Sequence, residues 1–388
     1  MPWFERSISE LEKFAVKRAV ARVIDAETFY PQSGYPAVRA FEHALSMRLG
    51  DFPVVGLNSG TDALVSALRL VGVQDGDEVI VPAFSYISTA SSVLLAGGTP
   101  VFVDVSEDDY AVDPTKVEAK VTKRTKAIIV AHLFGQPALG MNDILLFAKK
   151  HKLFVVEDAA QSFGATMTMN GKERSVGTMG DFGCLSFSST KILAAPGNGG
   201  ALVIKDSAFL EDARRMRFYG AKRPYFDYPL LGGNTGLHEV QAAALFAKLD
   251  FFDHWLFHRK TNADVYQNCL AQVEELMLPR ARLESARTWY RYVIRSKERD
   301  TLFERLARRA RQNWHLMPGI NYPVPLPYFK VFERLGYAQG DFPIAEKLSS
   351  EVLSLPITND VSRDDVMGIV REIEKFFGDL DAGTPPGP

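Results

Sequence analysis

Short runs of β-branched and other apolar residues alternate with helical patterns between about residue 54 and residue 205. Six of these runs are strand candidates: Val79–Val81, Val101–Val103, Ala127–Val130, Phe154–Val156, Cys184–Phe187 and Leu202–Ile204. Most are apolar on both faces, which is typical of parallel strands buried between helices. The helical patterns lie at about Thr61–Val71, Ser85–Ala96 and Asn142–His151. The alternation predicts an α/β fold with an open, mostly parallel sheet, whose ligands bind beyond the carboxyl ends of the strands.

The length of 388 residues favours more than one hydrophobic core. We expect a large α/β domain over residues 1–250 and a smaller α+β domain over residues 251–380, with the N-terminal helix as a candidate to pack on the small domain. A long helical region, at about 238–272, leaves the large domain. The tail, residues 381–388, is rich in Pro and Gly and is expected to be disordered.

Composition excludes several classes of protein. The net charge of −2 gives no argument for binding nucleic acid or an anionic membrane surface. No apolar run reaches the ~18–20 residues that span a bilayer, and the charged N-terminus lacks the apolar segment of a signal peptide. Two cysteines exclude a disulfide scaffold and suit a reducing cytoplasm, and the histidines show no metal-ligand spacing, so we expect no catalytic metal.

A lysine and a carboxylate each lie beside a strand-like run. Lys191 follows Gly183-Cys-Leu-Ser-Phe-Ser-Ser-Thr190, and Asp158 ends Val155-Val-Glu-Asp158. Amine chemistry on pyridoxal phosphate needs a lysine that forms a Schiff base and a carboxylate that keeps the pyridine nitrogen protonated. Lys191 could instead be an ordinary solvated charge, and Asp158 could instead be a helix N-cap or part of a structural ion pair.

Further polar and aromatic residues could complete such a site. Ser59, Gly60 and Thr61 open a helical pattern, where free N–H groups and hydroxyls can cradle a phosphate, although the same residues could form a plain N-cap. Ser186 could add a hydroxyl to the same phosphate. Two more residues could contact the cofactor ring: Tyr86, which could stack on the pyridine or simply pack in the core, and Gln161, which could hydrogen-bond the phenolic oxygen.

Several motifs occur together and in order along almost the whole chain. They are Asn58-Ser-Gly-Thr-Asp-Ala-Leu64, Gly76-Asp-Glu-Val-Ile-Val-Pro82, Gly98-Thr-Pro-Val-Phe-Val-Asp104, Phe134-Gly-Gln-Pro137, Glu157-Asp-Ala-Ala-Gln-Ser-Phe-Gly-Ala165, Ser186-Phe-Ser-Ser-Thr-Lys191 and Tyr322-Pro-Val-Pro325. The series resembles the sugar aminotransferases of the DegT/DnrJ/EryC1/StrS family, which are fold-type I pyridoxal-phosphate enzymes.

The resemblance implies a role for each candidate residue. It implies that Lys191 is the Schiff-base lysine and moves the proton, that Asp158 pairs with the pyridine nitrogen and that Gln161 contacts the phenolic oxygen. It also implies that Ser59, Gly60, Thr61 and Ser186 hold the phosphate and that Tyr86 stacks on the ring. In the family a loop asparagine of the neighbouring subunit completes the phosphate site. Asn234 matches it, which implies a homodimer with shared active sites.

At two positions that concern substrate binding, the chain departs from the usual sequence of the family. Gly236 stands where the family loop usually has arginine, and Asn321 stands where its His-Tyr-Pro element usually has histidine. Arg217, Lys222 and Arg223 are candidates to replace the lost charge.

The expected function is transfer of an amino group from glutamate or glutamine to a keto-sugar, commonly nucleotide-linked, by a ping-pong mechanism. The departures leave open a keto-cyclitol or an unlinked keto-sugar as acceptor. A sugar dehydratase and a non-catalytic binding or regulatory protein are competing hypotheses, and Lys191 argues against the dehydratase because those enzymes typically have histidine there.

Overall fold

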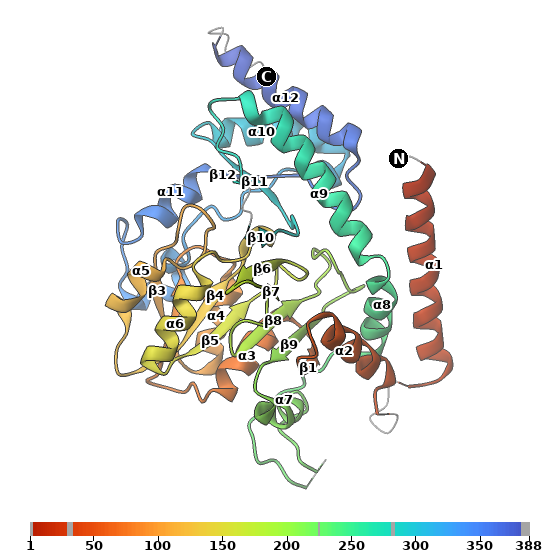
Figure 1. Cartoon of the computed structure of the whole chain (residues 1–388), viewed down its shortest axis with the longest axis vertical. Helices are drawn as coiled ribbons and strands as arrows, with labels where there is room; N and C mark the ends of the chain where they lie inside the picture. The colour runs from red at the N-terminus through yellow and green to blue at the C-terminus, as the bar shows by residue number, and fades with distance from the viewer. Residues whose placement is uncertain (1–2, 29–33, 224–225, 281–283, 382–388) are drawn as a thin grey trace.

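The computed structural model of the chain describes residues 3–28, 34–223, 226–280 and 284–381. Its centre is a seven-stranded sheet of order β1-β9-β8-β5-β4-β2-β3 (Figure 1). The strands are β1 (Val54–Leu57), β2 (Glu78–Pro82), β3 (Thr99–Val103), β4 (Thr125–Ala131), β5 (Phe154–Asp158), β8 (Phe182–Ser186) and β9 (Gly200–Ile204). Strand β9 runs antiparallel to both its neighbours, and the other neighbouring pairs are parallel. The predicted mostly parallel sheet is confirmed.

Helices cover both faces of this sheet. Successive side chains of a strand point to opposite faces, so a strand that is apolar throughout needs helices on both sides. Ile80 packs in one core with α2 (Pro36–Arg48), α6 (Met141–His151) and α8 (Glu239–Leu249). Its neighbours Val79 and Val81 pack in a second core with α3 (Gly60–Leu70), α4 (Ile87–Ala96) and α7 (Leu210–Met216). Two buried faces explain why the strands read as continuous apolar runs.

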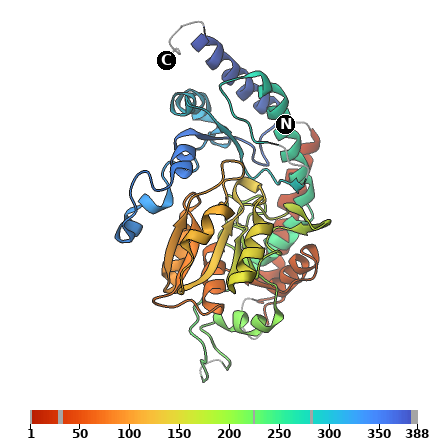
Figure 2. The same ribbon diagram turned by 60° about the vertical axis from the view of Figure 1, so that its left-hand side comes forward.

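The C-terminal part forms a separate core above the sheet in Figure 1. It contains the antiparallel pair of β11 (Tyr292–Arg295) and β12 (Val352–Leu355), with α10 (Arg299–Arg309) and α12 (Arg363–Asp381). Helix α11 (Pro343–Glu351) packs instead in the second core of the large sheet, through Ala345 and Leu348. Helix α9 (Phe252–Cys269) connects the two regions, because Phe252 packs in the core of the large domain and Tyr266 in the C-terminal core. Figure 2 shows the C-terminal region standing over one edge of the sheet.

The remaining elements are peripheral. Helix α1 (Trp3–Asp25) lies along α8, which belongs to the region we expected to form the large domain (Figure 1). A three-stranded sheet joins β10 (Ser285–Ala286) to β6 (Thr166–Met169) and β7 (Lys172–Ser175), and α5 (Pro114–Val117) is short. The region at 238–272 consists of α8 and α9 rather than one helix. Of the predicted tail, Asp381 ends α12, and residues 382–388 lie outside the described residues.

Candidate active site

The predicted site residues come from one edge of the large sheet. Asp158 is the last residue of β5 and Ser186 the last residue of β8, and β5 and β8 are neighbours. The antiparallel strand β9 begins at the same edge, because Gly200 pairs with Ser186. The carboxyl ends of β5 and β8 therefore meet the start of α3 and the loop that carries Lys191, as expected for an open α/β sheet.

The start of α3 lies against the end of β8. A Cβ added to Gly60 would lie 2.9 Å from the Cβ of Ser186, and one added to Gly200 would lie 2.3 Å from the carbonyl carbon of Ser59. Ser59 is the N-cap of α3, since its hydroxyl accepts from the Asp62 N–H at 3.0 Å. Gly60 and Thr61 are the first helical residues, so helix geometry gives their N–H groups no intrahelical acceptor. Small residues thus keep open a cradle of backbone N–H donors suited to a phosphate, while the Ser59 hydroxyl donates to the Asp62 carboxylate at 2.7 Å.

Asp158 is a buried carboxylate held by one hydroxyl and one backbone N–H. Its side chain accepts from the Thr89 hydroxyl at 2.7 Å and from the Ala160 N–H at 3.2 Å. Because Thr89 donates its one proton to the carboxylate, the Ser85 hydroxyl, 2.7 Å away, donates to Thr89. Asp158 is 7% exposed, and it forms no ion pair within the described part of the chain. A buried carboxylate without a cation favours a ligand that brings a positive charge.

Gln161 has a fixed orientation. Its Oε1 accepts from the backbone N–H of Phe134 at 3.0 Å, and its Nε2 donates to the Tyr322 hydroxyl at 2.8 Å. Since a backbone N–H can only donate, the amide oxygen must face Phe134. The N–H donors of the Gln161 amide therefore face Tyr322.

Lys191 lies over an aromatic ring. Its Nζ is 4.7 Å from the ring centroid of Tyr290, and it takes part in no ion pair among the described residues. Burial would raise the pKa of Tyr290, but the charges of Lys191 and Arg291 and the nearby Thr190 side chain lower it to about 8. A small cavity is lined by Gln161, Ser186, Lys191 and Tyr290 together with other residues. The lysine is thus close to two of the predicted cofactor ligands.

Tyr86 lies at the opening of the site. It is the N-cap residue of α4, is 54% exposed, and its ring centroid lies 6.2 Å from that of Tyr322. Because the ring is exposed, the competing interpretation of Tyr86 as a core residue is wrong.

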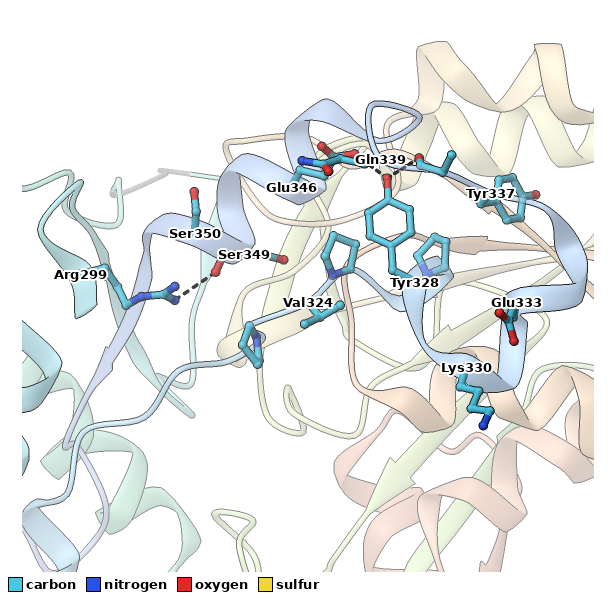
Figure 3. Close-up of a pocket in the computed structure, with 14 residues that line it drawn as sticks. Arg299, Val324, Tyr328, Lys330, Glu333, Tyr337, Gln339, Glu346, Ser349 and Ser350 are labelled. Atoms are coloured by element: carbon cyan, nitrogen blue, oxygen red, sulfur yellow. Dashed lines mark hydrogen bonds between the residues drawn. The ribbon is translucent and has the colours of Figure 1, made fainter. Parts of the chain in front are cut away.

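A larger cavity of about 710 Å³ lies beside residues 323–325, on the chain after Tyr322 (Figure 3). Its lining includes Arg299, Tyr328 and Glu346, and none of the predicted site residues. The Tyr328 hydroxyl and Glu346 are already hydrogen-bonded to each other and to neighbouring backbone. We therefore place the candidate active site at Lys191 and not in this larger cavity.

Asn234 is exposed and lies in the segment between α7 and α8. Its backbone pairs with Phe218, and the next residue, Thr235, accepts from the Asn58 N–H at 2.7 Å. Asn234 is therefore near the start of α3.

The residues suggested as replacements for the missing arginine and histidine of the family differ in their burial and in their partners. Arg217 is buried and bonded to Glu42 and to the carbonyl of Gly56, so the interpretation of Arg217 as a substrate contact is wrong. Asn321 turns its Oδ1 to the Ser354 hydroxyl at 3.1 Å. Lys222 and Arg223 are exposed in the segment after α7.

Four neighbours of the site, Thr89, Tyr290, Arg291 and Tyr322, were not predicted from the sequence. Thr89 lies one helical turn after Tyr86, and that spacing was the available signal. Tyr322 belongs to the motif Tyr322-Pro-Val-Pro325, for whose tyrosine no role was predicted. Nothing in the local sequence marks Tyr290 or Arg291, because their proximity to Lys191 depends on the tertiary fold.

The residues fit pyridoxal phosphate. The buried Asp158 lacks a cation among the described residues, the glycines leave a donor-lined cradle, and Gln161 and Lys191 line one small cavity. Among the described residues no group of three or more His, Cys, Asp or Glu side chains could hold a metal ion. No helix in the described ranges is long and apolar enough to cross a membrane.

Comparisons with known proteins agree on one family. The model of the DegT/DnrJ/EryC1/StrS aminotransferase family matches residues 12–374. The UDP-N-acetyl-3-dehydro-α-D-glucosamine 3-aminotransferase of Acidithiobacillus ferrooxidans is 37% identical, over 87% of this chain and 88% of its own length. The dTDP-3-amino-3,6-dideoxy-α-D-galactopyranose transaminase of Aneurinibacillus thermoaerophilus is 35% identical, over 96% and 98%. The crystal structure of S. venezuelae DesV superimposes with a TM-score of 0.88 at 33% identity, covering 96% of this chain and 97% of that one.

Proposed function

Because the chain belongs to the DegT/DnrJ/EryC1/StrS aminotransferase family, we propose that it transfers an amino group from glutamate or glutamine to a keto-sugar. The observation that carries this proposal is the meeting of Lys191, Asp158 and the cradle at the start of α3 at one edge of the sheet. The two relatives act on nucleotide-linked sugars by name, which supports a nucleotide-linked acceptor.

Pyridoxal phosphate, when bound, supplies an aldehyde that receives the amino group and a ring that withdraws electrons from the reacting carbon. Ser59, Gly60, Thr61 and Ser186 would hold its phosphate. Asp158, oriented by Thr89, would keep a proton on the ring nitrogen, and Gln161 would donate to the phenolic oxygen.

Lys191 would first hold the cofactor and then, once released, act as the base and acid that moves a proton between carbon atoms. The Tyr290 ring would stabilise the ammonium group of Lys191 by a cation–π contact while Lys191 carries the proton. Tyr86 would cover the open face of the ring and limit access of water.

We further propose a homodimer in which Asn234 of one subunit contributes to the phosphate site of the other, in a cytoplasmic enzyme. Its exposure leaves the Asn234 side chain accessible to a second subunit, which supports this role. An unlinked keto-sugar or keto-cyclitol is the second candidate acceptor, since Gly236 carries no charge and Asn321 is turned toward Ser354.

The test is the absorbance spectrum of the protein loaded with pyridoxal phosphate, before and after L-glutamate or L-glutamine is added separately. We expect one donor to convert the cofactor from its aldehyde form to its amine form. Lys191→Ala should abolish this response, whereas Lys172→Ala, at an exposed lysine of β7, should leave it unchanged. A cofactor spectrum that neither amino acid alters would point to another amino donor or to elimination chemistry, and failure to bind the cofactor would end the enzymatic interpretation.

A further inference from the structure

Arg291 is a cation beside the candidate active site that no assigned role uses. It immediately precedes β11, and its backbone N–H donates to the carbonyl of Phe134 at 3.3 Å. Its guanidinium carbon lies 5.2 Å from the ring centroid of Tyr290, the same ring that Lys191 contacts. Arg291 and Lys191 are therefore both neighbours of one aromatic ring.

The charge of Arg291 is not neutralised by a carboxylate. Among the described residues it forms no ion pair, although the nearby Arg295 pairs with Glu351 and Arg299 pairs with Asp300. The side chain is half-buried, so its charge is only partly hydrated. A guanidinium in that position attracts an anionic ligand, whereas Arg217 already has Glu42 as its partner.

Arg291 also lies close to Asn321, one of the two positions where this chain lacks a charged or ionisable residue that the family usually has. A Cβ added to Gly319 would be 3.6 Å from Nη1 of Arg291 and 3.0 Å from Oδ1 of Asn321. The two side chains therefore approach the same point. Asn321 is the uncharged residue at the position where the family usually has histidine, and Arg291 brings a positive charge close to it.

We propose that Arg291 binds an oxyanion of a substrate beside Lys191, with the Tyr290 ring as its support. The proposal rests on the proposed aminotransferase function and names a determinant of its substrate recognition. A planar guanidinium can hold a carboxylate or a phosphate through two parallel hydrogen bonds. The oxyanion comes either from the carboxylate of the amino-acid donor or from the phosphates of a nucleotide-linked acceptor.

The electrostatics of Tyr290 support a positive potential at this place. Burial would raise the pKa of its phenol, yet the charges of Lys191 and Arg291 bring it down to about 8. The same potential that favours a phenolate favours a bound carboxylate or phosphate.

The two sources of the oxyanion can be separated by calorimetric titration of the cofactor-loaded enzyme with unreactive probes. Glutarate has the carboxylates of the donor without its amine, and uridine diphosphate has the phosphates of the acceptor without its sugar. Arg291→Gln should weaken the binding of one probe by about 10- to 100-fold, the loss typical of a hydrogen bond to a charged group. Arg291→Lys, which keeps the charge but not the fork, should recover part of that affinity.

A matched control is Arg280→Gln, because Arg280 is an exposed arginine whose partner is Asp108. It should bind both probes as the wild type does. Unchanged binding of both probes by Arg291→Gln would overturn the proposal, and so would a wild-type enzyme that binds neither. Equal weakening of both probes together with loss of cofactor binding would mean a structural role and would also overturn it. The response of the wild-type spectrum to glutamate or glutamine tests the proposed function independently of Arg291.

Discussion

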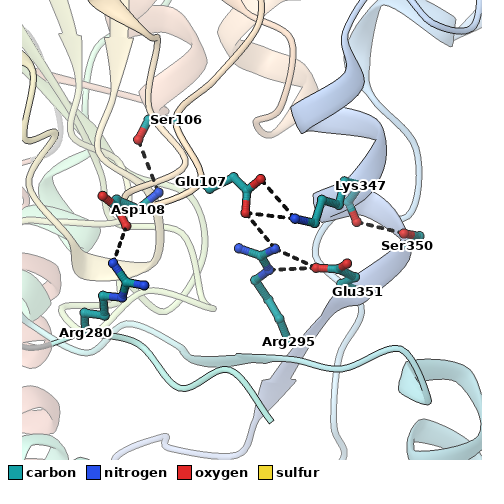
Figure 4. A network of polar contacts seen from close by, with 8 residues as sticks. All are labelled: Ser106, Glu107, Asp108, Arg280, Arg295, Lys347, Ser350 and Glu351. Carbon is teal, nitrogen blue, oxygen red and sulfur yellow. Dashed lines mark hydrogen bonds and ion pairs between the residues drawn. The ribbon is translucent and has the colours of Figure 1, made fainter. Parts of the chain in front are cut away.

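A buried arginine joins the two parts of the molecule, and its removal gives a sharp test of the structure. Arg295 on β11 donates to Glu351 at the end of α11 and to Glu107 in the loop after β3, and Lys347 also binds Glu107 (Figure 4). Arg280 binds Asp108, the next residue of that loop, at 3.3 Å. The side chains of Arg295 and Glu351 are 7% and 11% exposed, whereas those of Arg280 and Asp108 are 75% and 47% exposed.

The two pairs should therefore differ in their contribution to stability. Arg295→Met leaves the buried carboxylate of Glu351 without its cation, which costs roughly 3–5 kcal/mol. Arg280→Met removes an exposed pair worth at most about 1 kcal/mol. With about 2.1 cal/mol/K of unfolding entropy per residue, a chain of 388 residues loses about 1.2 °C of melting temperature for each kcal/mol. The expected losses are roughly 4–6 °C for Arg295→Met and about 1 °C for Arg280→Met.

The assay is thermal unfolding of the cofactor-loaded proteins, followed by circular dichroism at one scan rate. The double variant Arg295→Met/Glu351→Leu should recover part of the loss, because it removes the unpaired carboxylate as well. Equal melting temperatures for Arg295→Met and Arg280→Met would refute the reasoning that burial decides the contribution of these ion pairs.

Three more predictions concern single groups. Thr89→Val, which removes the hydroxyl that orients Asp158, should weaken pyridoxal phosphate binding by about 10-fold or more in a fluorescence titration, and Thr89→Ser should preserve it. In an ultraviolet titration of the cofactor-free protein, one tyrosine should ionise near pH 8, and this step should disappear in Tyr290→Phe and move to higher pH in Lys191→Met. Burial would raise the pKa of Glu107, but hydrogen bonds and ion pairs with Lys347 and Arg295 lower it below 4.5, the value of an unperturbed glutamate. The ionised carboxylate therefore stabilises the fold above pH 4.5, and this stabilisation is lost as the pH falls through the lowered pKa of the folded state. The difference in melting temperature between wild type and Glu107→Gln should therefore shrink between pH 5 and pH 3.

The large sheet was predictable because burial on both faces leaves a direct mark on the sequence. Each of the six predicted runs overlaps a strand, and α3, α4 and α6 lie within one or two residues of their predicted positions. The reversed direction of β9 was not predictable, since an apolar run reads the same in either direction. The strand β1 and the small sheet of β6, β7 and β10 were also missed, because four-residue or shorter strands carry little periodicity.

The site was predictable where residues lie at strand ends, because the carboxyl ends of parallel strands meet at one edge. Asp158 and Ser186 come together for this reason. Contacts between distant segments carry no such signal. Thr89 and Asp158 are 69 positions apart, and Gln161 and Tyr322 are 161 positions apart, so their hydrogen bonds follow only from the assembled fold.

Arg217 and Arg291 show why the role of a charge cannot be assigned from sequence position alone. Arg217 was a candidate because it shares a segment with the cations Lys222 and Arg223, but Glu42, 175 positions away, neutralises it. Arg291 has no sequence signal, yet it reaches the same ring as Lys191 and meets no carboxylate among the described residues. Whether an arginine can hold a substrate depends on which acid the fold brings to it, because a carboxylate neutralises the charge of the guanidinium that it pairs with. The affinity of this site for oxyanions should therefore change with substitutions at Arg291 and not with those at the exposed Lys222 or Arg223.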